Sequence, residues 1–194
     1  MLCYQSVCYN RAMNEQLEFL RQIIKRLDQA GIPYMLTGSL AMTIHAQPRM
    51  TRDIDIVVEY TPERSGALAR LFDDIGVVDR ESVEEAARTQ GMFNVIHRDW
   101  VIKADFIARK SGRFRETEFS RRRQLEIDGM EVWVVTVEDL ILSKLAWGMD
   151  ASSALQTRDV RTLIASGKNL DWEYLRHWAG ELGLSRHLEE AAGE

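Results

Sequence analysis

The sequence predicts an α/β (α+β) protein with a mixed sheet flanked by helices and a C-terminal helical bundle. Three observations support this fold class. Short runs of β-branched and other apolar residues alternate with segments of helical periodicity through the first 136 residues. Two pairs of such runs are separated by short polar turns, as expected of β-hairpins. After residue 136, apolar residues recur at helical spacing alone.

The first part of the chain combines one long helix with the central strands. Apolar residues recur at helical spacing over 14–30, and a Gly-x-Pro sequence ends that helix. A strand at 33–37, a helix of buried composition at 39–46 and a strand at 53–59 follow. These three segments form the central motif of the predicted fold.

Two helices and two hairpins are predicted next. A Thr-Pro pair opens a helix over 61–75, and a capping box predicts a short helix over 83–89. The apolar segments 92–97 and 100–108, separated by a polar pair, predict one hairpin. An Asp-Gly turn at 128–129 predicts the other.

The C-terminal part is predicted to be wholly helical. Thr136 caps a helix that runs to about residue 150, and further helices are expected at 152–166, 172–182 and 185–192. We therefore divide the chain into three segments. They are a disordered leader at 1–12, a core at 13–136, and a helical region at 137–194 that packs on the core.

Composition limits the classes of function. The chain has 194 residues, 45% of them hydrophobic, and no apolar run approaches the length of a membrane span. Its net charge of −5 argues against broad electrostatic binding to nucleic acid but allows a local basic groove. Cys3 and Cys8 could pair, bind a metal with outside help or do nothing, and the last choice fits a reducing cytoplasm. We expect a cytoplasmic protein without a membrane partner.

The central motif carries residues suited to phosphate and metal chemistry. Gly38 and Ser39 follow the first strand, so the N–H groups of the next helix and the Ser39 hydroxyl face the end of that strand. Such a helix start suits a phosphate. Asp53 and Asp55 lie two residues apart in a predicted strand and therefore project from one face. Two like charges on one face need a cation between them. The alternative is an acidic solvent face, which fits poorly with the apolar residues around them.

The Gly-Ser turn and the Asp-x-Asp strand resemble the signature of the nucleotidyltransferase superfamily that includes DNA polymerase β. The motifs TGSLA, TRDIDIVVE and KADFI, with the helical C-terminal region, are similar to AbiEii-like nucleotidyltransferases over about 14–190. The resemblance implies that Gly38 and Ser39 contact a nucleoside triphosphate. It also implies that Asp53 and Asp55 coordinate magnesium and that Asp105 completes the site. From the residues alone, the alternative is that Asp105 is an exposed residue on an edge strand.

The resemblance extends to residues of the C-terminal helices. It implies that Lys144 steadies the phosphates and that Asp159 or Arg158 orients Lys144 or the nucleotide. Lys144 also fits a surface lysine whose stem covers apolar neighbours. Arg52 precedes the acidic pair and could contact phosphate or pair with a carboxylate.

The resemblance implies an enzyme that moves a nucleoside monophosphate from a nucleoside triphosphate to a hydroxyl and releases pyrophosphate. Two Mg²⁺ ions would be the cofactors. The acceptor would be tRNA, as for a toxin-like enzyme, or a partner protein, as for an antitoxin-like enzyme of a toxin–antitoxin pair. Seven cations at 109–123 favour tRNA, although such a run is usually a solvated loop. The rival hypothesis is a catalytically silent scaffold that binds a nucleotide or a partner protein.

Overall fold

The protein is built around a mixed sheet of seven described strands in the order β3-β4-β5-β2-β1-β7-β6. The computed structural model describes the backbone of residues 2–46, 53–100, 102–151 and 154–193. In chain order, the strands are β1 (Tyr34–Thr37), β2 (Asp53–Val58), β3 (Gly76–Val78), β4 (Met92–His97), β5 (Lys103–Ala108), β6 (Arg123–Ile127) and β7 (Met130–Val134). The predicted fold class is confirmed.

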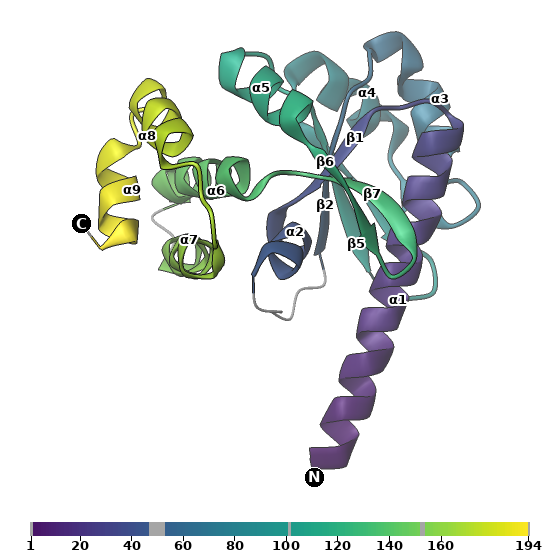
Figure 1. Cartoon of the computed structure of the whole chain (residues 1–194). Helices are drawn as coiled ribbons and strands as arrows, with labels where there is room; N and C mark the ends of the chain where they lie inside the picture. Colours follow the sequence, from purple (N-terminus) through teal and green to yellow (C-terminus); the bar gives the residue numbers. More distant parts are fainter. Residues whose placement is uncertain (1, 47–52, 101, 152–153, 194) are drawn as a thin grey trace.

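Helices cover the sheet from both sides. They are α1 (Leu2–Gln29), α2 (Gly38–His45), η1 (Pro62–Arg64, a 3₁₀ turn), α3 (Ser65–Arg70), α4 (Arg80–Thr89), α5 (Arg113–Arg121), α6 (Val137–Ala151), α7 (Ala154–Ser166), α8 (Trp172–Glu181) and α9 (Ser185–Ala192). Figure 1 shows α6 to α9 gathered on one side of the molecule and α3 and α4 on the other. Helix α2 contacts β1 and β2 as well as α6 and α7. It therefore joins the sheet to the C-terminal helices.

One face of the sheet carries apolar side chains that belong to the hydrophobic core. Side chains of this face alternate along the strands with those of the other face, because strand residues point to opposite sides in turn. Ile54, Ile56, Leu36 and Phe106 on this face are fully buried. Phe93 on β4 stacks on Phe106, with ring centroids 4.9 Å apart. This apolar layer fixes the register of the central strands.

The opposite face carries a row of polar side chains. Strands β2 and β5 are parallel, and their register places Asp55 opposite Asp105. The antiparallel neighbours place Thr37 of β1 opposite Asp55 and Asn94 of β4 opposite Asp105. Because residues in register share a sheet face, these four side chains form one line across four strands. We call this line the polar row.

Most predicted elements lie within a few residues of their expected positions, with four differences, the first being helix α5, which was not predicted. Helix α1 begins at Leu2, earlier than the expected residue 14. The division of the chain into three segments, with a disordered leader at 1–12, stays a prediction. Helix α3 ends at Arg70, because the next N–H groups bond carbonyls only three residues back. Strand β3 was not predicted, since three residues are too few to give an alternating pattern.

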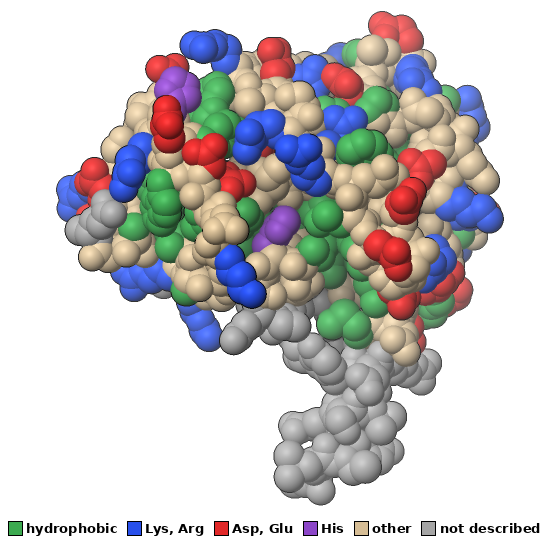
Figure 2. Space-filling model, in the orientation of Figure 1, with side chains coloured by type: hydrophobic (Ala, Val, Ile, Leu, Met, Phe, Trp, Pro, Cys, Tyr) green, Lys and Arg blue, Asp and Glu red, His purple; other side chains and the backbone are tan. Residues whose placement is uncertain are grey.

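The described surface is mixed in charge. Figure 2 shows cationic and anionic side chains interspersed over the visible face, as expected from a net charge of −5. None of the described helices is both long and apolar enough to cross a membrane. The cytoplasmic location stays a prediction from the sequence.

Candidate active site

The start of α2 lies directly against the side chain of Asp55. Strand β1 ends at Thr37, and Gly38 begins α2 with a positive φ of 65°. A Cβ atom on Gly38 would lie 2.0 Å from Asp55 Oδ2, so only glycine permits this approach. The Ser39 N–H donates to the same oxygen over 3.4 Å. The helix terminus predicted to bind phosphate and the strand predicted to bind metal are therefore in contact.

Asp55 is half-buried, and its protonation is coupled to its neighbours. Burial raises the pKa of its carboxyl from 3.8 to about 6. The Ser39 N–H opposes this rise in pKa, the negative charges of Asp105 and Asp53 add to it, and the positive charge of Lys144 opposes it. A cation placed among these carboxylates would relieve the repulsion that raises the pKa.

Asp105 lies on an interior strand and is buried. Its strand, β5, is paired on both sides, by β4 and by β2. The reading of Asp105 as an exposed residue on an edge strand is therefore wrong. Lys103 Nζ lies 2.8 Å from Asp105 Oδ2, and the Asn94 amide donates to Asp105 Oδ1. Both carboxylate oxygens thus contact donors from within the chain.

Asp53 begins β2 on the same sheet face as Asp55, as the alternation predicted. It is exposed and stands opposite Lys103 in the register with β5. Among the described residues, no three acidic, histidine or cysteine side chains are close enough together to hold one metal ion. The three carboxylates still supply the oxygen ligands that Mg²⁺ prefers, on adjacent strands and on one face. The residues fit the ion in their chemistry and in the sheet face that they share, and the cluster would have to tighten around it.

Lys144 is buried rather than exposed. Only 3% of this residue is accessible, so the reading of a surface lysine with a solvated head group is wrong. Its Nζ lies 2.8 Å from Asp159 Oδ2 and donates to Gln156 Oε1 over 3.4 Å. This ion pair joins α6 to α7, and the charge of Lys144 reaches Asp55. Asp159 therefore holds Lys144 in position. This is one of the alternatives stated from the sequence, in which Asp159 or Arg158 orients Lys144 or the nucleotide.

One predicted nucleotide-binding residue of the described chain, Arg158, is not brought to the carboxylates. Arg158 is exposed on α7, and its carbonyl accepts a hydrogen bond from Thr162. Among the described residues, no hydrogen bond or ion pair joins the Arg158 side chain to the polar row. Arg52 lies outside the described residues. The roles of these two arginines stay predictions.

The basic stretch 109–123 is mostly helical, and four of its arginines contact carboxylates of the described residues, among them exposed Arg113, which lies 3.6 Å from Glu181 Oε2. Arg109 lies 2.6 Å from Glu59 Oε1. Arg115 lies 2.8 Å from buried Glu118 and donates to the Ser143 hydroxyl. The expectation of a loop was wrong for most of this stretch, because α5 occupies it, whereas Lys110, Arg113 and Arg123 are exposed to solvent.

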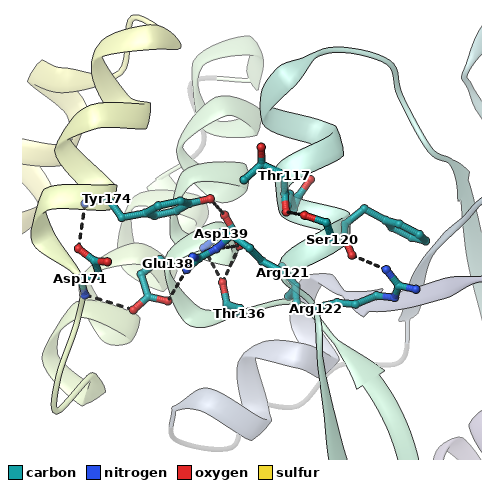
Figure 3. Close-up of polar contacts among 12 residues, drawn as sticks. Thr117, Ser120, Arg121, Arg122, Thr136, Glu138, Asp139, Asp171 and Tyr174 are labelled. Carbon is teal, nitrogen blue, oxygen red and sulfur yellow. Dashed lines mark hydrogen bonds and ion pairs between the residues drawn. The ribbon is translucent and has the colours of Figure 1, made fainter.

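Arg121 belongs to a buried network that links α5 to α6 and α8 (Figure 3). Its Nε lies 3.2 Å from Asp139, which is fully buried, and its guanidinium stacks 3.9 Å from the Tyr174 ring centroid. Asp139 also accepts hydrogen bonds from the hydroxyls of Thr136 and Tyr174. The Thr136 cap was predicted from the sequence. The contacts of Asp139 with Arg121 of α5 and Tyr174 of α8 were not predicted. This network fixes the start of α6, the helix that carries Lys144.

Sequence reasoning assigned no role to Lys103 or Asn94. Lys103 lies two residues before Asp105, a spacing that places both side chains on one strand face. Asn94 carried no comparable signal, because its position opposite Asp105 depends on the antiparallel pairing of β4 with β5.

The fold and the site define a nucleotidyltransferase. A glycine-serine helix start against an acidic strand, with a third acid on the neighbouring strand, is the arrangement that the superfamily resemblance predicted. The chain belongs to the family described as nucleotidyltransferase of unknown function (DUF6036), whose model matches residues 11–190. It is accordingly a transferase of the EC 2.7.7 type. The superfamily is confirmed, and the closer resemblance to AbiEii-like proteins stays a prediction.

Solved structures with the same fold include antibiotic-modifying enzymes. ANT(2'')-Ia in complex with adenylyl-2''-tobramycin is 17% identical, with a TM-score of 0.60 over 89% of this chain and 99% of that one. The lincosamide adenylyltransferase LnuA with bound lincomycin is 11% identical, with a TM-score of 0.54 over 79% and 97%. A putative nucleotidyltransferase from Thermotoga maritima is 18% identical, with a TM-score of 0.52 over 87% and 94%. A search of curated proteins found no match.

Proposed function

We propose that this protein transfers a nucleoside monophosphate from a nucleoside triphosphate to a hydroxyl acceptor, releasing pyrophosphate, in a reaction that depends on divalent metal. One observation carries the proposal. Asp55 and Asp105 stand opposite each other on parallel strands, and the Ser39 N–H at the start of α2 donates to Asp55 from the side of β1. The reaction needs a group that binds the phosphates and carboxylates that bind metal. The N-terminus of α2 and the pair of carboxylates supply these two parts, and they meet at the side chain of Asp55.

The arrangement supports one direction for the proposed reaction. The N–H of Ser39 and its neighbours at the start of α2 hold the leaving phosphates. Lys144 adds positive charge beside Asp55 and is kept in place by Asp159. Because the attacking and leaving oxygens lie in line, the acceptor hydroxyl enters from the opposite side, over β5 and β4. Asp105 is the carboxylate on that side, and it takes up the proton of the hydroxyl.

Asp53, Asp55 and Asp105 are the residues that would hold magnesium. Two Mg²⁺ ions bound there would supply activation of the hydroxyl and neutralisation of the leaving phosphates.

The acceptor that we favour is a small hydroxylated compound. Two proteins of the same fold are described with adenylyl-tobramycin and with lincomycin, and this chain covers 99% and 97% of their lengths. The case for tRNA depended on the cations at 109–123. Arg109, Arg115 and Arg121 now have partners within the chain, which weakens that case. tRNA, as the target of a toxin-like enzyme, therefore ranks second.

Label transfer tests the function and names the acceptor class. The purified protein is incubated with magnesium and each nucleoside triphosphate labelled at the α-phosphate. Tobramycin, lincomycin, total tRNA and cell lysate are offered in turn. Asp55→Asn is the test variant, and Asp128→Asn is the matched control at an exposed turn whose positive φ of 49° asparagine also tolerates.

We expect label on one acceptor with the wild type and with Asp128→Asn, and none with Asp55→Asn. Labelled protein in the lysate would identify the antitoxin-like reaction on a partner protein. Triphosphate binding without any transfer would instead favour the silent scaffold.

A further inference from the structure

Lys103 is the nearest described cation to the carboxylates of the polar row. It begins β5, and its Nζ lies 2.8 Å from Asp105 Oδ2. The Asp105 side chain is 9% exposed, whereas that of Lys103 is 42% exposed. The lysine therefore approaches a buried carboxylate from the solvent side, and its stem is free to withdraw.

All three carboxylates act on Lys103. The hydrogen bond to Asp105 raises the pKa of the ammonium, and the charges of Asp105, Asp53 and Asp55 add to this effect. The register explains the reach of these charges, because Lys103 stands opposite Asp53 and two residues from Asp105 on the same face. The ammonium thus lies within the field of all three acids.

The same geometry sets a condition for metal binding. Asp105 Oδ1 accepts from the Asn94 amide and Oδ2 contacts Lys103, so an incoming ion meets an occupied carboxylate. Asn94 is neutral and leaves a lone pair on Oδ1 available. Lys103 is charged, and its ammonium cannot stay beside Oδ2 when a divalent cation binds that oxygen.

We propose that Lys103 is a built-in counter-ion that holds Asp105 in place and competes with divalent metal for its Oδ2. This inference rests on the proposed function, since it assigns Asp105 to the metal site. Metal binding displaces the ammonium toward solvent, and the site admits a metal ion only at the expense of this ion pair. Lys103 is a positioning residue that acts through Asp105.

The test measures Mn²⁺ affinity by isothermal titration calorimetry on the full chain. Lys103→Met removes the charge and keeps the length of the side chain, while Lys103→Arg keeps the charge. Lys25→Met is the matched control, because Lys25 is exposed on α1. Lys103→Met should bind Mn²⁺ about 1.5- to fivefold more tightly than the wild type, the range expected for a partly exposed ion pair. Lys103→Arg and Lys25→Met should match the wild type.

A second pair of variants separates competition from a structural role. In an Asp105→Asn background, Lys103→Met should tighten Mn²⁺ binding less than it does in the wild-type background, because the competing pair is already broken. A purely structural lysine would lower the melting temperature of Lys103→Met without tightening Mn²⁺ binding.

Affinity of Lys103→Met equal to or weaker than that of the wild type would overturn the inference while leaving the proposed function intact. Absence of Mn²⁺ binding in both proteins, with and without nucleoside triphosphate, would overturn both proposals.

Discussion

Replacing Gly38 with alanine tests the contact between α2 and Asp55. Gly38 has a φ of 65°, and an added Cβ would lie 2.0 Å from Oδ2, 2.5 Å from Cγ and 2.7 Å from Cβ of Asp55. Gly31 offers a matched control, because its φ is 58° and nothing lies within 4 Å of an added Cβ. The two variants share the backbone strain, and only Gly38→Ala forces Asp55 to move.

The backbone strain and the displacement of Asp55 differ in size and in their consequences. A left-handed backbone costs an L-residue about 1–2 kcal/mol. For a chain of this length, that strain lowers the melting temperature by about 2–8 °C. In Gly38→Ala, the nearest contact must also open from 2.0 Å to at least 3.0 Å. A displacement of about 1 Å at a reacting group lowers a rate by about a hundredfold.

Thermal unfolding and label transfer measure the two terms separately. We expect Gly31→Ala to lose stability and keep wild-type transfer. Gly38→Ala should lose more stability and about a hundredfold in transfer rate. Equal melting temperatures for the two variants, with transfer by Gly38→Ala at the wild-type rate, would refute the contact between α2 and Asp55.

Three further predictions concern charge and burial. The folded pKa of Asp55 is about 6, above its ordinary 3.8, so the folded chain binds the proton more tightly. The contribution of Asp55 to the free energy of unfolding is fully present below pH 3.8 and is lost as the pH rises through 6. The free energy of unfolding of Asp55→Asn, measured with urea, should therefore increase relative to that of the wild type from pH 4 to pH 7. Lys144→Met leaves the Asp159 charge buried and should cost about 3–5 kcal/mol in urea unfolding. The double variant with Asp159→Leu should recover most of that loss, and a double variant as unstable as the single one would contradict the buried pair. Tyr174→Phe removes a donor to buried Asp139 and should cost about 1–3 kcal/mol by the same assay, whereas an unchanged midpoint would mean that this hydrogen bond contributes nothing.

Local patterns predicted the acids but not their surroundings. The two-residue spacing of Asp53 and Asp55 placed both on one strand face, and the structure agrees. The sequence left open whether Asp105 lies on an edge strand, because strand order depends on the outer strands β4 and β3. A single strand pattern carries no information about which strands flank it.

The basic stretch and Lys144 show the same limit. Arg121 pairs with Asp139 from the following helix and stacks on Tyr174 from a later one. Lys144 pairs with Asp159 on the next helix. A charge run looks solvated until its partners are known, and these partners lie many residues away along the chain. Contacts between residues far apart in the chain therefore determine where the cations lie. The alternation of side chains along one strand determines where Asp53 and Asp55 lie.

The fate of each phosphate tests the central claim most directly. One sample receives a nucleoside triphosphate labelled at the α-phosphate, and another receives the same compound labelled at the γ-phosphate. Nucleotidyl transfer predicts that the α-label becomes attached to the acceptor and that the γ-label leaves as pyrophosphate. Both events should require divalent metal and Asp55. Release of the γ-label as free phosphate, or equal α-label transfer by Asp55→Asn, would contradict the account.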